Sequence, residues 1–167
     1  MDETHLLLTD LKKGIFTLTL NRPKVNAFNF ELIAALQSAF KQAERETAVR
    51  CVVLTGAGEV FSAGQDVTAF QQDEPVSFRS HLLRTYNPLI LQIRRLEKPV
   101  LAAINGAVSG AALGIALACD LRLASERARF VVGFGGIGLA PDSAVSLLLP
   151  ALIGLGRATE FTFTNAS

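Results

Sequence analysis

The stretch "KPVLAAINGAVSGAALGIALACDLRLAS", residues 98–125, decides the fold class of this chain. Its apolar run at Val100–Ile104 predicts a strand, and the small residues that follow predict a tight turn. The apolar, alanine-rich run after the turn predicts a helix, and "LRLA" at 121–124 predicts a further strand. Strands and helices that alternate in this way are typical of an α/β fold.

The N-terminal half contains the same kinds of element. His5–Asp10 and Ile15–Leu20 are β-prone runs on either side of a Lys-Lys-Gly turn, which predicts a hairpin. Apolar residues at spacings of three and four predict a helix over 30–45, with Asn29 as its N-cap. Cys51–Thr55 is a continuous apolar run, which is the pattern of a strand buried on both faces.

The C-terminal half continues the alternation. The polar segment 68–77 predicts a mobile loop, and a helix is expected over 78–96. "SERARFVV", residues 125–132, predicts a short strand. A further helix should begin near Asp142 and be interrupted or end near Pro150.

Length and composition bound the kind of protein. A chain of 167 residues predicts a single domain over 1–167, and half of its residues are hydrophobic. The net charge of +1 gives no reason to expect nucleic acid or a membrane surface as a partner. Cys51 and Cys119 lie in apolar runs and are expected to be buried thiols, which predicts a cytoplasmic location. Ala107–Ala118, the longest apolar stretch, is too short to span a membrane, and the N-terminus matches no targeting peptide.

Two glycine-rich loops raise the possibility of a dinucleotide site. The segment 133–138 matches the G-x-G-x-x-G pattern literally, whereas 56–61 ends on Phe61 in place of the third glycine. The pattern requires a further strand with an acidic residue about 20 residues later. Glu160 lies near that distance but in a helix-like stretch, so the context argues against a dinucleotide.

A second interpretation of the small-residue loops is that they bind a negatively charged oxygen. The loops 61–66 and 105–114 each follow a predicted strand, and the second one opens a helix. Free N–H groups at such positions stabilise a developing oxyanion, as on a polarised carbonyl. The alternative that stays open for each loop is that its glycines only permit close packing.

The two loops and their surroundings resemble the crotonase (enoyl-CoA hydratase/isomerase) superfamily. The resemblance runs from about Ile15 to the end, through "NRPKVNAFN", "VVLTGAGEVFSAGQDV", the opening stretch, "ARF" and "GIGLAPDSAVSLLLPALIG". It implies a crotonase-like spiral of ββα units and an acyl-coenzyme A thioester as ligand. It also implies a homotrimer or hexamer. Since the family continues with further helices, and nothing caps "GRATEFTFTNAS", we expect a C-terminal helical part to be missing. This last segment is expected to form the start of a helix, followed by a strand or a loop.

The resemblance also assigns roles to residues. The oxyanion donors would be the backbone N–H groups of Gln65 and Ala111, the latter at a position where the family usually has glycine. Val25 and Ala27 match positions that flank coenzyme A. The other positions expected to contact substrate are Ala63, Gly64, Asp66, Val67, Gly110 and Phe134.

The acid–base positions depart from the hydratase pattern. The two glutamates of the family's hydratases correspond to Gly114 and Phe134, neither of which can move a proton, so ordinary hydratase activity is not expected. Asp142 stands where some isomerases and dehalogenases of the family place an acidic residue. It is expected to be the acid/base, with a nucleophile or a helix N-cap as the alternatives. A nucleophile would need an aromatic cradle for the ring, a role that Phe134 fits only loosely.

The predicted activity is that of an isomerase that moves a double bond in an enoyl-CoA through an enolate. The "FSAGQD" and "PDS" segments look most like the isomerases of phenylacetate-type degradation. The alternatives are other crotonase chemistry (hydratase-like, thioester hydrolase or dehalogenase) and a non-catalytic acyl-CoA-binding protein. No metal and no cofactor beyond the coenzyme A of the substrate are expected. His5 and His81 are expected to have surface or packing roles, and Asp120 a structural hydrogen bond.

Overall fold

The computed structural model describes residues 5–70 and 77–167. Its strands are β1 (Leu7–Lys12), β2 (Ile15–Leu20), β3 (Cys51–Gly56), β4 (Val60–Ser62), β5 (Val100–Ile104), β6 (Ala107–Ser109), β7 (Leu121–Ala124) and β8 (Arg129–Val131). Its α-helices are α1 (Phe30–Arg45), α2 (Phe78–Arg84), α3 (Tyr86–Arg95), α4 (Ala111–Ala118), α5 (Val145–Ile153) and α6 (Leu155–Thr164). Two 3₁₀ turns, η1 (Val67–Phe70) and η2 (Gly135–Ile137), complete the elements. Six of the residues predicted as a mobile loop, 71–76, lie outside the described residues.

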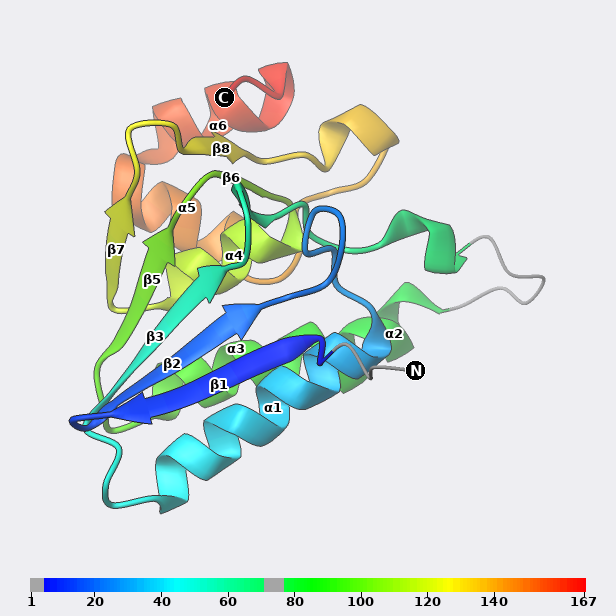
Figure 1. Cartoon of the computed structure of the whole chain (residues 1–167). Helices are drawn as coiled ribbons and strands as arrows, with labels where there is room; N and C mark the ends of the chain where they lie inside the picture. Colours follow the sequence, from blue (N-terminus) through cyan, green and yellow to red (C-terminus); the bar gives the residue numbers. More distant parts are fainter. Residues whose placement is uncertain (1–4, 71–76) are drawn as a thin grey trace.

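The strands form two sheets, and from β3 onward successive strands belong to the larger and the smaller sheet in turn (Figure 1). The larger sheet has the order β1-β2-β3-β5-β7, in which β1 and β2 form the predicted antiparallel hairpin and the other neighbours are parallel. The smaller sheet has the order β4-β6-β8, with parallel neighbours. Two strands, one for each sheet, are therefore followed by helical structure three times in succession. This is the spiral of ββα units that the resemblance implied.

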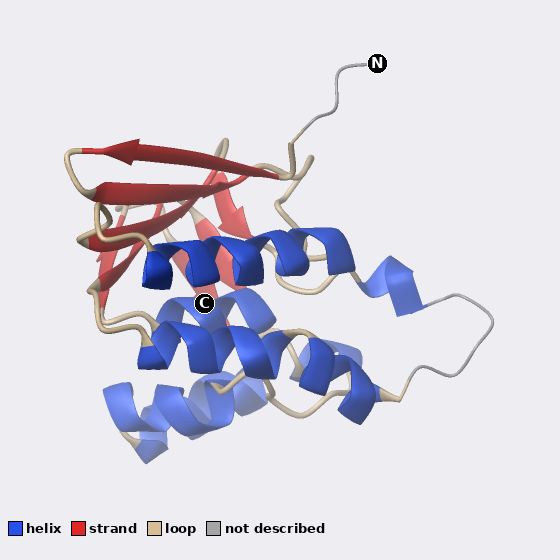
Figure 2. Cartoon of the chain, turned by 90° about the horizontal axis from the view of Figure 1, so that it is seen from below, coloured by secondary structure: helices blue, strands red, loops and turns tan. Residues whose placement is uncertain are grey.

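The inner strands of the larger sheet, β2, β3 and β5, are buried on one face only. Along β3, buried residues alternate with half-buried ones, so the expectation of a strand buried on both faces was wrong. The helices gather on one side of the strands (Figure 2), where α1 packs on β2 and on α3, and α3 packs on α4. A strand has a side-chain period of two, so the alternate residues that face these helices form the core. The apolar side of α1 was predicted correctly except at two positions, since Ala35 is half-buried and Ile33 is buried in addition. The buried residues of α1 are Leu32, Ile33, Leu36, Ala39, Phe40 and Ala43.

The expected helix over 78–96 is instead two helices separated at Thr85. The backbone leaves helical geometry there, with φ −113° and ψ −87°, and the Thr85 hydroxyl donates to the carbonyl of His81. Pro88 explains the break, since its ring would clash with the Arg84 carbonyl in a continuous helix. The side-chain amide of Gln37 donates to the carbonyl of Arg84, which Pro88 leaves without a helical donor, and to the carbonyl of Thr85, at 3.1 and 2.8 Å.

Two expectations about the C-terminal segments were also wrong. The helix expected to begin near Asp142 begins at Val145, and its N-cap is Ala144, whose side chain makes no capping bond. Asp142 is therefore not a helix N-cap. Pro150 lies inside this helix, which ends at Ile153. The last segment forms α6, which runs to Thr164 and is followed by a loop, one of the two expected continuations.

The cysteines and the apolar stretches behave largely as expected. Both cysteines are free thiols, Cys51 half-buried and Cys119 buried, and burial raises the pKa of the Cys119 thiol to about 12. Asp120 makes the expected structural bond, because its carboxylate accepts from the N–H of Val100 at 2.9 Å. No helix in the described residues is long and apolar enough to cross a membrane.

One buried amide holds the loop between β2 and α1. Asn26 has a positive φ of 53° and is 3% exposed. Its Nδ2 lies 3.0 to 3.2 Å from the carbonyl oxygens of Ala57, Val60 and Phe61, and its Oδ1 accepts from the N–H of Arg22. The loop is thereby joined to the β3–β4 turn through a single side chain.

We predict that Asn26→Ala lowers the free energy of unfolding by about 2 kcal/mol or more, because buried acceptors lose their donor. Asn29→Ala is the matched control in the same loop. Asn29 accepts one bond, from the N–H of Leu32, so its loss should cost about 1 kcal/mol. Denaturant unfolding of both variants measures the difference, and equal losses would contradict the role given to Asn26.

Candidate active site

A cavity of about 360 Å³ opens between β6 of the small sheet, the helices α2 and α3, and the start of α4. The predicted site residues that line it are Val25, Ala27, Ala63, Gln65, Val67, Gly110, Ala111, Phe134 and Asp142. Residues that the sequence analysis did not assign to the site also line it: Phe78, His81, Tyr86, Ser109, Gly133, Ile137 and Leu139. A second cavity of about 530 Å³, between α4, α5 and β8, is larger. Its lining among the described residues includes no carboxylate, so we assign the chemistry to the smaller one.

The backbone around Gln65 leaves its N–H available to a ligand. The N–H of Phe28 donates to the carbonyl oxygen of Gly64 at 2.7 Å, and the N–H of Asp66 donates to the carbonyl oxygen of Phe28 at 2.9 Å. In an extended chain, successive peptide groups point to opposite sides, so the N–H of Gln65 points away from Phe28. No acceptor for it occurs among the described residues.

The second N–H group belongs to the first residue of α4. Ala111 opens the helix after Gly110, so its N–H has no partner within the helix. Gly64 has a φ of 86°, and a Cβ built on it would lie 2.6 Å from the Ser109 carbonyl oxygen and 3.3 Å from the Ala111 nitrogen. The two loops therefore approach each other closely, which places both N–H groups at one end of the cavity.

Asp142 is the one carboxylate in the lining of this cavity among the described residues. It is half-buried, and burial raises the pKa of its carboxyl above the usual value of 3.8. Two opposing effects are smaller: the Ser143 hydroxyl donates to Oδ1 at 2.7 Å, and the His81 ring lies near enough to interact electrostatically. A carboxyl with a raised pKa in an apolar cavity is suited to take up and return a proton.

The two positions that match the family's glutamates have no proton to exchange. A Cβ built on Gly114 would lie 2.0 Å from the Ser143 carbonyl oxygen, so a larger residue cannot stand there unless the turn after Asp142 moves. Phe134 is 6% exposed and lines the cavity with an apolar ring. The structure thus packs the Asp142 turn against the place where the first glutamate would begin.

His81 has a more specific environment than the sequence indicated. It is 5% exposed, so a surface role is wrong, while the packing role is confirmed by edge contacts with Phe30 and Tyr86. Its Nε2 lies 3.1 Å from Oε1 of Gln65, which also accepts from the Tyr86 hydroxyl at 2.5 Å. Pro88 was the available signal, since the helix break that it imposes brings these side chains together. His5, by contrast, is exposed as expected.

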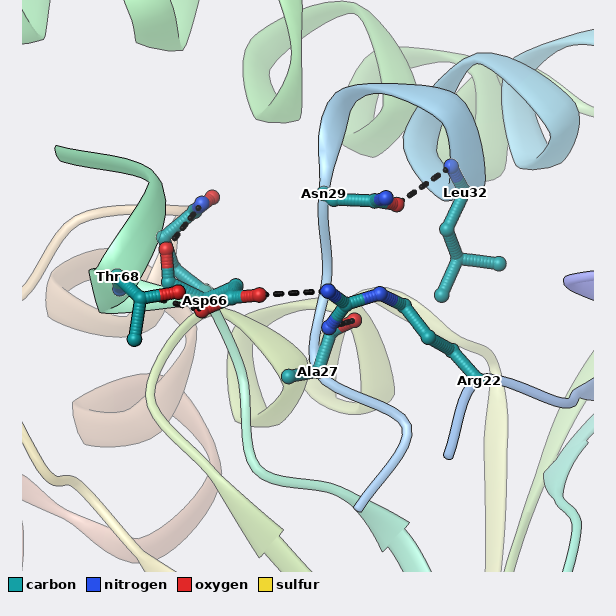
Figure 3. Close-up of polar contacts among 7 residues, drawn as sticks. Arg22, Ala27, Asn29, Leu32, Asp66 and Thr68 are labelled. Carbon is teal, nitrogen blue, oxygen red and sulfur yellow. Dashed lines mark hydrogen bonds and ion pairs between the residues drawn. The ribbon is translucent and has the colours of Figure 1, made fainter. Parts of the chain in front are cut away.

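Two residues expected to contact substrate are not part of the cavity lining. Gly64 faces the Ser109 carbonyl, and the Asp66 carboxylate is occupied by protein partners (Figure 3). Its Oδ2 accepts from Arg22 at 2.7 Å, and its Oδ1 accepts from the hydroxyl and the N–H of Thr68. The Thr68 and Arg22 bonds outweigh desolvation and lower the pKa of Asp66. Because Arg22 also donates to the Ala27 carbonyl, Asp66 ties the loop that carries Gln65 to the β2–α1 loop.

We predict that Gly114→Ala lowers the free energy of unfolding by about 1–3 kcal/mol, because the methyl group overlaps the Ser143 carbonyl. Gly156→Ala is the matched control. A Cβ there meets nothing within 4 Å, and alanine favours the helix, so stability should stay equal or rise. Unfolding curves of both variants test this, and an unchanged Gly114→Ala protein would contradict the close approach.

Comparison with known proteins identifies the family. Residues 10–167 match the family described as enoyl-CoA hydratase/isomerase. The 1,2-epoxyphenylacetyl-CoA isomerase of Escherichia coli is 42% identical over 158 residues, which are 92% of this chain and 60% of that protein. The 4-chlorobenzoyl coenzyme A dehalogenase-2 of Arthrobacter sp is 38% identical over 165 residues, 96% of this chain and 60% of that protein.

Solved structures agree with the sequence matches. The enoyl-CoA hydratase of Bacillus anthracis has a TM-score of 0.90 and 31% identity, with 96% of this chain and 63% of that chain covered. Pseudomonas aeruginosa DspI has a TM-score of 0.91 and 29% identity, with 99% and 63% covered. The chain spans about 60% of the length of the curated relatives it matches. The fold is therefore the crotonase fold, and the chain belongs to the enoyl-CoA hydratase/isomerase family.

Proposed function

We propose that the protein binds an acyl-CoA thioester and moves a C=C bond in its acyl chain, with Asp142 as the acid/base. The observation that carries this proposal is an apolar cavity that presents two backbone N–H groups and, among the described residues, a single carboxylate. A double-bond shift needs one group to take a proton from one carbon and return it to another. It needs no oriented water. A reaction that requires one is disfavoured, because positions 114 and 134 carry no glutamate to orient it.

The proposed steps balance in protons and charge. A 3-enoyl-CoA has its double bond between the third and fourth carbons. Asp142 removes a proton from the second carbon, and the negative charge moves to the thioester oxygen, where the N–H groups of Gln65 and Ala111 bind it. Protonated Asp142 then returns the proton to the fourth carbon, which leaves a 2,3-double bond. Val25 and Ala27, at the mouth of the cavity, would flank the coenzyme A moiety.

The named activities of the relatives support an acyl-CoA enzyme and leave the reaction open. The first relative reported above is an isomerase, and a trans-2-decenoyl-[acyl-carrier-protein] isomerase of Streptococcus mutans is 36% identical. Hydratase-like or thioester hydrolase chemistry and a non-catalytic acyl-CoA-binding role are the alternatives. Assembly as a homotrimer or hexamer and a cytoplasmic location belong to the same proposal and rest on the family.

A second candidate reaction has one specific observation in its favour. Three aromatic side chains, those of Phe78, Tyr86 and Phe134, line the cavity near Asp142. Such a cradle suits an aryl ring, on which Asp142 would act as a nucleophile, and one relative is named as a 4-chlorobenzoyl coenzyme A dehalogenase. Chloride release from 4-chlorobenzoyl-CoA distinguishes this reaction from the isomerase.

We predict that the protein converts a 3-enoyl-CoA to the conjugated 2-enoyl-CoA, and that Asp142→Asn lowers kcat by about 10²–10⁴-fold. The absorbance of the conjugated thioester measures the reaction. The base must be ionised and its pKa is raised, so kcat/KM should fall as the pH drops through a value above 3.8. Asp10→Asn, which changes an exposed aspartate on β1, is the matched control and should keep full activity.

Turnover that survives Asp142→Asn would sink the assigned base. No turnover in either protein, with acyl-CoA still bound, would mean that the cavity serves another thioester or another reaction.

A further inference from the structure

The side chain of Gln65 is held by two buried residues that the proposed reaction does not use. Tyr86 is 2% exposed and His81 is 5% exposed, and both direct a polar atom at Oε1 of Gln65. Gln65 is also the residue whose backbone N–H faces the cavity. The same residue therefore joins a proposed oxyanion donor to a hydrogen-bonded cluster on α2 and α3.

The chain itself fixes the direction of these hydrogen bonds. The other end of the Gln65 amide lies 3.1 Å from the backbone carbonyl oxygen of Asp66, which can only accept. That end must therefore be the NH₂ group, and the end that faces Tyr86 and His81 must be the carbonyl oxygen. Since this oxygen can only accept, Tyr86 donates its hydroxyl proton, and His81 carries its proton on Nε2.

The break between α2 and α3 is what allows both side chains to reach Gln65. In a continuous α-helix, residues five positions apart point about 140° away from each other. His81 and Tyr86 are five positions apart, and the chain leaves helical geometry between them at Thr85. The edge contact of Phe28 with Tyr86 fixes the ring from the other side, with centroids 6.1 Å apart.

We propose that Tyr86 and His81 are positioning residues, which clamp the Gln65 side chain and thereby fix the backbone N–H that binds the thioester oxygen. This inference rests on the proposed function, because it assumes that this N–H binds the oxyanion. Bonds to Phe28 hold one edge of the Gln65 backbone, and the clamp holds the side chain that leaves it. An oxyanion donor acts only within a narrow range of distance, so a small displacement weakens it.

The electrostatics of the cluster keep both donors in the required state. Burial, and to a lesser degree the charge of Asp142, raise the pKa of the Tyr86 phenol, which stays protonated. Burial lowers the pKa of His81 against the smaller, opposing effect of Asp142, which favours the neutral ring. A neutral ring with its proton on Nε2 is the form that the Gln65 oxygen requires.

The test uses a probe that reports on the oxyanion site without turnover. Acetoacetyl-CoA loses a proton from its second carbon to give an enolate with its own ultraviolet absorbance. Binding to the two N–H groups should lower the apparent pKa of this ligand relative to the free thioester. We expect Tyr86→Phe, which keeps the ring and removes the hydroxyl, to raise the apparent pKa of the bound ligand by about one unit, or tenfold in ionisation. Affinity for butyryl-CoA, which forms no enolate here, should change less than twofold.

A pair of His81 variants separates the clamp from general packing. In His81→Gln, the amide nitrogen stands near the position of Nε2 and can still donate, whereas the shorter side chain of His81→Asn cannot reach. We expect His81→Gln to keep the lowered ligand pKa and His81→Asn to lose it about as Tyr86→Phe does. Thr55→Val is the control for lost stability, because it removes a hydroxyl bond to the Ala103 carbonyl far from the cavity. It should leave the ligand pKa unchanged.

Each outcome decides between the inference and the function on which it rests. If the parent protein lowers the ligand pKa, and if Tyr86→Phe and His81→Asn each lower it by as much as the parent does, the clamp is refuted and the oxyanion site stands. If the parent does not lower it at all, the oxyanion site is refuted, and the clamp with it. Asp142→Asn should keep the lowered ligand pKa, since that variant removes the proposed base and leaves both N–H groups in place.

Discussion

The candidate site depends on the close approach of two backbone segments at Gly64 and Ser109. Any side chain at Gly64 would begin 2.6 Å from the Ser109 carbonyl oxygen, and the φ of 86° is one that other residues rarely adopt. This contact sets how near the loop after β4 lies to the first turn of α4. The distance between the N–H groups of Gln65 and Ala111 follows from it, and so does the width of the cavity between them. A carbonyl oxygen can be bound by both groups only if this contact is kept.

The repeated ββα unit explains why the approach occurs at this place. The larger sheet contains β3 and β5 as parallel neighbours, and the smaller one contains β4 and β6 in the same relation. The segments that follow β4 and β6 must therefore leave the small sheet side by side. The first carries Gln65 and the second carries Ala111, so the spiral itself delivers one N–H group from each of two successive units to the same point.

The sequence was sufficient for elements whose signals are local. The helix over 30–45 follows from its apolar spacing and the Asn29 cap. The segments 61–66 and 105–114 were predicted as loops and are loops only in part, because β4 covers 61–62 and β6 covers 107–109. Sequence patterns were insufficient where one residue acts on a distant one. The repeat of the ββα unit has no counterpart in the sequence, because each unit uses different side chains to bury the same face. The alternative that Asp142 caps the helix was wrong, because Ser143 and Ala144 adopt left-handed backbone geometry between Asp142 and the helix. Serine and alanine rarely adopt this geometry, so the sequence does not indicate the turn.

The break between α2 and α3 shows the same limit at the site. Apolar spacing over 78–96 fits one helix, and Pro88 alone indicates the interruption. Even with the break foreseen, the sequence would not have placed His81 and Tyr86 on Gln65, because that contact joins residues 16 and 21 positions apart. The family resemblance therefore supplied the residues expected at the site. The hydrogen bonds of the side chains then added His81 and Tyr86 to them.

The turn after Asp142 accounts both for the carboxylate of Asp142 in the cavity and for the lack of a glutamate at position 114. Gly114 lets the Ser143 carbonyl approach to a point that a glutamate side chain would have to occupy. The same turn holds the Asp142 carboxylate in the cavity. Burial raises the pKa of this carboxylate there, and the hydrogen bond that it accepts from the Ser143 hydroxyl lowers the pKa by less. A second carboxylate at 114 would thus collide with the turn, and it would also add a like charge beside Asp142. The two arrangements exclude each other on steric and electrostatic grounds.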